Sequence, residues 1–217
     1  MRLNPARFNR HLANIGQEVR WRRSYACACV GISGQPDPKH KLCNGKGVLW
    51  AAPIDTYAGV SHQTLTPELA AAGNWDIGEL VLTIQEASAM WEFIGKNDRV
   101  LLKNSTDVFS SALKRGSPTE RILFSVKDFQ RVFWLDPVTR NPVEGGLPQI
   151  DAMGNLSWPA GDGPPDGFPY SLTGMRFDEY YVFKNNPQDR GEHNGARLPK
   201  RVELKAFDLF NRSIVSA

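Results

Sequence analysis

Three cysteines and one histidine form the tightest cluster of potential metal ligands in this sequence. Cys27 and Cys29 make a C-x-C pair, ten residues follow, and His40 and Cys43 make an H-x-x-C pair. Two close pairs separated by a short loop suit a tetrahedral Zn²⁺ ion, because each pair can occupy one edge of the tetrahedron. We therefore predict that these four residues bind one zinc ion.

The glycines that follow the last cysteine favour the same prediction. Gly45 and Gly47 lie just after Cys43, where glycine lets the backbone turn sharply and direct its N–H groups at a thiolate. Protein groups would fill all four positions around the ion, so we expect a structural site. The alternatives are three unpaired cysteines, an iron–sulfur cluster with one histidine ligand, and a redox or nucleophilic cysteine.

The segment around the cysteines has no hydrophobic pattern of its own. From Ser24 to Gly47 the chain is rich in Cys, Gly, Pro, Asp and Lys. Metal binding would contribute folding free energy on the order of 10 kcal/mol to such a segment. We predict an N-terminal helix plus zinc-binding module over residues 1–50 and a β-rich body domain over residues 51–217.

Apolar residues near the N-terminus recur at helical spacing. The residues spaced by four, three and four positions are Phe8, Leu12, Ile15 and Val19. This spacing predicts an amphipathic helix from Pro5 to about Arg22, with proline at its first position. The helix is short, so we expect its apolar stripe to dock on another part of the protein.

The N-terminal segment is also strongly basic. Residues 1–46 contain nine basic and two acidic residues, whereas residues 47–217 contain 17 basic and 21 acidic ones. Such an asymmetry favours an acidic partner, either nucleic acid or an acidic protein surface, and a solvated helix face is the alternative. The residues that we assign to partner binding are Arg7, Arg10, Arg20, Arg22 and Arg23.

Short runs of branched and aromatic residues follow Gly47, and turn-forming residues bound them. They predict strands at Val48–Ala52, Leu80–Ile84, Arg99–Lys103, Arg121–Val126, Val132–Leu135, Leu156–Trp158, Tyr170–Leu172, Glu179–Phe183 and Arg201–Phe207. The fold class that follows is mainly β (α+β), with an antiparallel β-barrel or β-sandwich-like domain and long loops. Thr66–Ala72 and Val108–Lys114 read as short helices or turns, and residues 161–169 and 185–196 as polar loops.

The sequence carries no pattern typical of a catalytic or membrane-spanning protein. It has no Walker loop, no G-x-S-x-G, no dinucleotide-binding glycine pattern and no long apolar run. Clustered cysteines beside a histidine suit metal binding in a reducing compartment. We therefore expect no enzyme activity, no membrane association and folding in the cytoplasm.

The cysteine block CACVGISGQPDPKHKLCNGKGVLW resembles neck and head-completion proteins of tailed bacteriophages. In that pattern a C-x-C pair, a G-x-P-D-P loop and a C-x-x-C-x-G-x-G run precede a β-rich domain. This sequence departs from it at His40, where the pattern has cysteine, an exchange that zinc tolerates. The stretches DIGELVLTIQ at 76–85, NDRVLLKNSTDVFSSALKRG at 97–116, DEYYVF at 178–183 and GARLPKRVELKAFD at 195–208 resemble the same class.

The resemblance implies a virion structural protein that assembles in the host cytoplasm. Its copies would form a homo-oligomeric ring, a head–tail connector or collar that joins the portal or an adaptor ring to the tail proteins. Double-stranded DNA would pass through the ring without sequence-specific binding. Two other functions stay open from the residues alone, a zinc-containing nucleic-acid-binding module and an uncharacterised metal-dependent hydrolase.

Overall fold

A computed structural model describes residues 5–31, 34–40, 42–43, 45–62, 79–151, 154–159, 161–185, 192–193 and 196–207. Its helical elements are α1 (Pro5–Ile15), the 3-10 turn η1 (Ala28–Val30) and α3 (Met90–Phe93). Its strands are β1 (Gln17–Arg22), β2 (Ser24–Ala26), β3 (Val48–Trp50), β4 (Ile54–His62), β5 (Glu79–Ile84), β6 (Arg99–Lys114), β7 (Val126–Leu135), β8 (Pro142–Glu144), β9 (Gln149–Ile150), β10 (Leu156–Ser157), β11 (Pro169–Asn185), β12 (Glu192–His193), β13 (Ala196–Arg197) and β14 (Lys200–Ala206). The described part of the chain is mainly β, which confirms the predicted fold class.

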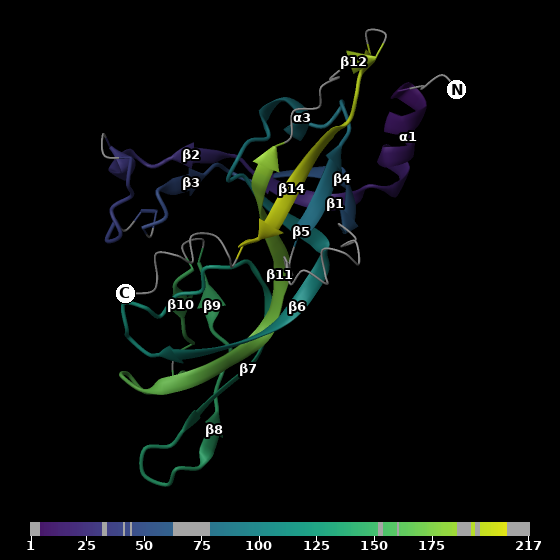
Figure 1. The fold of residues 1–217 in the computed structure, drawn as a ribbon. Coiled ribbons are helices and arrows are strands. Elements are labelled where there is room, and N and C mark those ends of the chain that lie inside the picture. The colour runs from purple at the N-terminus through teal and green to yellow at the C-terminus, as the bar shows by residue number, and fades with distance from the viewer. Residues whose placement is uncertain are drawn as a thin grey trace, which may run out of the picture. The chain divides into compact units, whose positions relative to one another are not determined.

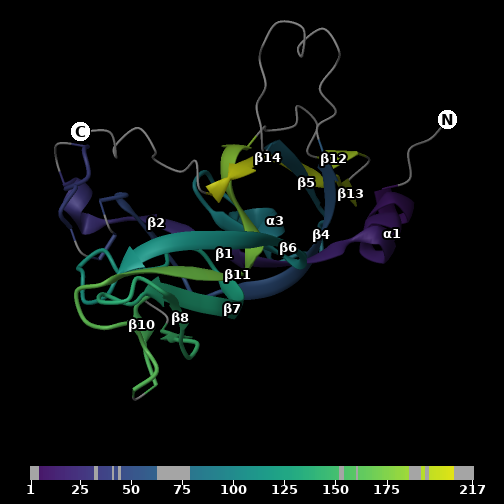
Figure 2. The same ribbon diagram turned by 90° about the horizontal axis from the view of Figure 1, so that it is seen from below.

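The described strands build one large sheet and several small pairs. The large sheet has eight strands in the order β14-β5-β4-β1-β6-β11-β7-β8 (Figure 1). β14 also pairs with β11, so the order of neighbours returns to its starting strand. β7 and β8 extend the sheet beyond β11. Figure 2 shows the long strands β6 and β11 running side by side, as their pairing requires.

The chain divides into two compact units, and β6 and β11 each contribute to both. Unit 1 comprises residues 1–104 and 179–217, and unit 2 comprises residues 105–178. The predicted division at residue 50 does not coincide with them, because β1 from the first fifty residues pairs with both β4 and β6. Each unit has its own hydrophobic core.

The core of unit 1 follows from period-two patterns. Along β14, Val202 and Leu204 are fully buried, as the alternation of this segment predicts. β14 pairs with β5 and β11, so both of its edges are covered. α1 packs its buried residue Leu12 against β4, where Gly59 leaves space: a Cβ at Gly59 would lie 3.0 Å from Leu12.

The predicted helix from Pro5 to Arg22 is too long. α1 ends at Ile15, and after Gly16 the chain continues as β1. Val19 and Trp21 are buried on β1 while their neighbours are more exposed. The spacing of four residues from Ile15 to Val19 fits a helix, whereas the spacing of two from Val19 to Trp21 fits a strand. The segment forms a strand because it pairs with β4 and β6.

Other predictions differ from the structure in length or type. The prediction of a short helix or turn at Val108–Lys114 is wrong, because this segment is the second half of β6. The prediction of a strand at Arg121–Val126 is also wrong. Arg121 forms only an isolated bridge, and β7 begins at Val126. β4 was not predicted. Thr66–Ala72 and most of the loop at 185–196 lie outside the described residues.

An ion-pair network crosses three neighbouring strands of unit 1. Asp55 of β4 accepts hydrogen bonds from Arg20 of β1 at 2.8 Å and from Lys103 of β6 at 3.1 Å. Lys103 also pairs with Glu18. The hydrogen bond from Arg20, followed by that from Lys103, lowers the pKa of Asp55 from 3.8 to about 2.

This lowered pKa predicts a specific loss of stability in acid. The folded protein binds a proton at Asp55 less readily than the unfolded chain does, so the stabilisation is present above about pH 4 and is lost as the pH falls to about 2. Because the carboxylate is exposed, water screens the pair and the effect is modest. We expect Asp55→Asn to lose less stability than the wild type between pH 4 and pH 2 in urea titrations. Glu86→Gln removes an exposed carboxylate and should lose as much stability as the wild type over this pH range. Equal losses of stability in D55N and the wild type would contradict the prediction.

Candidate metal centre

A short antiparallel strand pair carries the cysteine block. Ser24, Tyr25 and Ala26 of β2 pair with residues of β3, and the loop between these strands spans residues 27–47 (Figure 1). The backbone N–H of Cys27 donates to the carbonyl of Gly47 at 2.8 Å, which extends the ladder by one step. The first and last parts of the loop are therefore held together at its base.

Each half of the loop turns tightly at a cysteine. In the first half, η1 follows Cys27, and the N–H of Val30 donates to the Cys27 carbonyl at 3.0 Å. In the second half, the N–H of Lys46 donates to the Cys43 carbonyl at 3.0 Å. These turns present side chains from both halves to the same point.

The four predicted ligands converge there. Their donor atoms all lie within 4.8 Å of one another. The Nδ1 atom of His40 is 3.5 Å from the sulfur of Cys27 and 3.5 Å from that of Cys43, and the sulfurs of Cys29 and Cys43 are 3.5 Å apart. In a tetrahedral zinc site, donor atoms lie about 3.5–3.8 Å apart, given Zn–S of about 2.3 Å and Zn–N of about 2.0–2.1 Å. The cluster therefore has the dimensions needed to hold one metal ion.

Backbone N–H groups point at two of the sulfurs. Burial raises the pKa of the Cys43 thiol, but hydrogen bonds from the Gly47 N–H and from His40 outweigh it and bring the pKa down to about 6. The pKa of Cys29 rises to about 11, first because of desolvation and then because of hydrogen bonds with neighbouring thiols, although the Asp37 N–H opposes the rise. Sulfurs so close together compete for protons, which a metal cation would replace.

Two glycines of this loop are required by its geometry. Gly45 and Gly47 have φ values of +73° and +70°, in the left-handed region that favours glycine. A Cβ at Gly45 would lie 2.8 Å from the Pro38 carbonyl oxygen, and one at Gly47 would lie 2.9 Å from Pro36. The expectation that glycine turns the backbone after Cys43 is confirmed. Pro38 packs directly on Gly45, and Pro36 packs directly on Gly47.

The donor set is compatible with zinc. Thiolates and imidazole are the donors that Zn²⁺ uses in closed structural sites, and all four here come from the protein. Cys27 and Cys43 are each 3% exposed. A polynuclear iron–sulfur cluster places several irons and sulfides between its ligands and needs donor atoms farther apart than this cluster has them.

The structure does not bring the five arginines together on one helix face. Arg7 and Arg10 lie on α1, Arg20 and Arg22 on β1, and Arg23 between β1 and β2. Arg20 pairs with Asp55. The pKa of Arg22 is lowered by burial and then by the charge of Arg99. The role of these arginines in partner binding stays a prediction.

Contacts outside the ligand set anchor the metal-binding loop to the rest of unit 1, and the sequence analysis did not predict them. The ammonium of Lys46 lies 4.5 Å from the ring centre of Phe207, and the Trp50 indole donates to the Asn97 carbonyl at 3.0 Å. Arg99 also lies over the Phe207 ring, at 4.2 Å. These residues are far apart in the sequence, and no local spacing signals that they meet.

Comparisons with known proteins add no family to this description. No protein-family model matches the chain, and no curated protein is significantly similar to it. In the described part of the chain, no helix has both the length and the apolar character needed to cross a membrane.

Proposed function

We propose that this protein is a structural subunit of the neck of a tailed-phage virion, in a ring that joins portal and tail around the DNA channel. The resemblance of its cysteine block to head-completion proteins suggests the class. The convergence of Cys27, Cys29, His40 and Cys43 is the observation that carries the proposal. Four protein donors leave no position at the ion for water or substrate, so the centre fits a structural role better than a hydrolytic one.

The metal ion that we assign to the site is Zn²⁺. The sulfurs of Cys27, Cys29 and Cys43 and the Nδ1 atom of His40 would hold it. When bound, the ion supplies folding free energy to a loop that lacks a hydrophobic core. The Gly47 and Asp37 N–H groups would stabilise the thiolate charge.

Exposed apolar side chains favour a role in assembly. In unit 1, Tyr25, Tyr57 and Phe93 are 50%, 53% and 53% exposed. In unit 2, Leu135 and Val138 are 51% and 86% exposed. Subunit interfaces are rich in aromatic and large apolar residues. Copies of one chain that associate head to tail form a ring when the rotation between neighbours closes.

The proposal is tested with the purified full chain and its candidate partners. Elemental analysis is expected to find one zinc per chain. Mass photometry and electron microscopy are expected to find rings when the protein is mixed with the portal and tail proteins of the same phage. A chain that carries zinc but stays monomeric with every such protein contradicts the neck function and leaves the metal site standing.

A further inference from the structure

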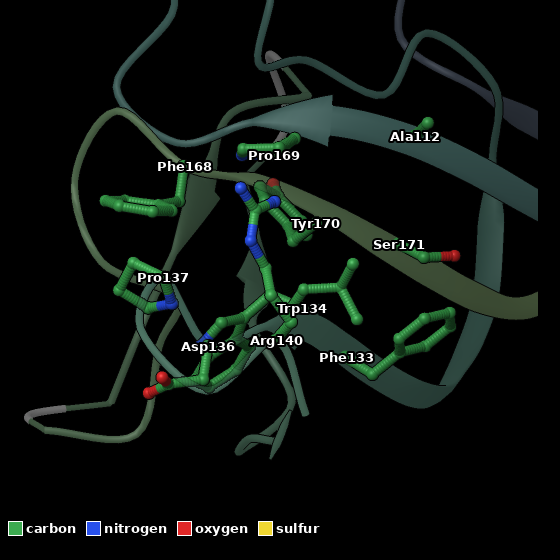
Figure 3. A pocket seen from close by; sticks show the side chains of 11 residues that line it. Ala112, Phe133, Trp134, Asp136, Pro137, Arg140, Phe168, Pro169, Tyr170 and Ser171 are labelled. Atoms are coloured by element: carbon green, nitrogen blue, oxygen red, sulfur yellow. The ribbon is translucent and has the colours of Figure 1, made fainter. Parts of the chain in front are cut away.

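A cavity of about 400 Å³ lies in unit 2, beside the turn that joins β7 to β8. Phe133, Leu135 and Pro137 line it from β7 and this turn, and Phe168 and Tyr170 line it from the start of β11 and the residue before it. Figure 3 shows the Arg140 side chain extending into this space toward Pro169 and Tyr170. Cavities of roughly 300–1,000 Å³ with apolar walls and a few polar groups are typical of binding sites.

The cavity differs from the metal centre in its chemistry. Its lining is mostly aromatic rings, prolines and Leu135, with Asp136 as the acidic and Arg140 as the basic side chain. Among the described residues, no carboxylate forms an ion pair with Arg140. A guanidinium beside apolar walls is a directional partner for a carboxylate, because its fork matches the two carboxylate oxygens.

The acidic residue of the cavity is already engaged by its own turn. Asp136 accepts hydrogen bonds from the N–H groups of Val138 and Thr139 at 2.9 and 2.7 Å, and from the Thr139 hydroxyl at 3.0 Å. These bonds, first that of the Thr139 N–H, lower the pKa of Asp136 and keep it ionised. The turn also places Arg140, whose φ is +60° and whose N–H donates to the Asp136 carbonyl at 3.0 Å.

We propose that this cavity binds an acidic, apolar peptide segment of a partner protein. A carboxylate of the segment pairs with the Arg140 guanidinium, and a neighbouring large apolar side chain packs among Phe133, Leu135 and Phe168. Val138, at the tip of the same turn and 86% exposed, extends the apolar surface beyond the cavity. A nucleic acid would require several cations for its phosphates, whereas the described lining of this cavity offers Arg140.

The test uses the full-length, metal-loaded protein and two capped tripeptides that differ in one group. N-acetyl-Phe-Asp-Leu-amide carries the carboxylate, and N-acetyl-Phe-Asn-Leu-amide carries the matching amide. By isothermal titration calorimetry at low salt we expect the Asp peptide to bind about two- to fivefold more tightly than the Asn peptide, because Arg140 is exposed and one such charge-assisted pair contributes about 1 kcal/mol or less.

Variants then locate the effect. Arg140→Gln is expected to remove the preference for the Asp peptide, Arg140→Lys to retain part of it, and Lys127→Gln, which removes an exposed cation of β7, to leave it unchanged. Equal binding of both peptides, no binding of either peptide, or a preference that survives in R140Q overturns the proposal. Self-association of the protein that R140Q abolishes also overturns it, because the occupant is then a second copy of this chain.

The proposal does not depend on the metal centre or on the proposed function. The cavity is built from residues of unit 2, whereas the cysteine block belongs to unit 1. A protein that fails to form rings can still distinguish the two peptides. A protein that carries zinc and forms rings can fail to do so.

Discussion

Cys43→Ser is expected to weaken zinc binding at least about 100-fold and to release the loop at residues 27–47 from its folded state. A serine hydroxyl is not a thiolate donor, and the loop has no hydrophobic core to replace the ion. Cys43 also fixes the second tight turn of the loop and receives the Gly47 N–H. Competition with a chromogenic chelator measures the affinity, and hydrogen exchange at the Cys27 and Val30 amides, which are hydrogen-bonded in the loop, measures the order.

The rest of unit 1 should survive this change. Leu82 and Val202 are fully buried in a core that does not include the cysteines, so their amides should keep their protection. His40→Cys is the matched control, because it keeps four donors and should keep one zinc per chain. If C43S holds zinc as tightly as the wild type, or if its loop amides stay protected without metal, the assignment of the site is wrong.

The candidate site could be predicted from sequence because its determinants are local. The short pairs Cys27–Cys29 and His40–Cys43 each lie within one turn of chain, and the Gly45 and Gly47 positions close the second turn. The structure then brings both pairs to within 4.8 Å. The contacts of the loop with distant aromatic residues such as Phe207 were not predictable, because tertiary packing alone brings these residues together.

The fold was predictable where burial falls on large side chains. In β14, the buried residues Val202 and Leu204 alternate with more exposed ones, and this pattern predicts a strand. In β4 the buried residues are Ala58 and Gly59, whose small side chains give little hydrophobic signal, so the strand was missed. In the second half of β6, Phe109 is buried while its neighbours are mostly small and polar. Pairing with a neighbouring strand, not the local pattern, makes this segment extended.

A buried carboxylate links the metal-binding loop to the large sheet. Asp98 is 1% exposed. One of its oxygens accepts from the Trp21 indole at 2.8 Å and from the Gly95 N–H at 2.9 Å. The other accepts from the N–H and the hydroxyl of Ser24, both at 2.8 Å. Because Ser24 begins β2, Asp98 fixes the point at which the chain leaves β1 for the metal-binding loop.

Asp98→Ala is expected to lower the free energy of unfolding by about 3–5 kcal/mol, because it leaves several buried donors without an acceptor. Asp98→Asn should cost less, about 2–3 kcal/mol, since the amide keeps the shape and one acceptor oxygen. Urea titration monitored by tryptophan fluorescence measures both. Asp166→Ala is the control: Asp166 is 91% exposed and pairs with Arg115, so its loss should cost about 1 kcal/mol or less. A D98A protein as stable as D166A would show that the donors around Asp98 find water or other partners, and that this carboxylate does not hold the loop to the sheet.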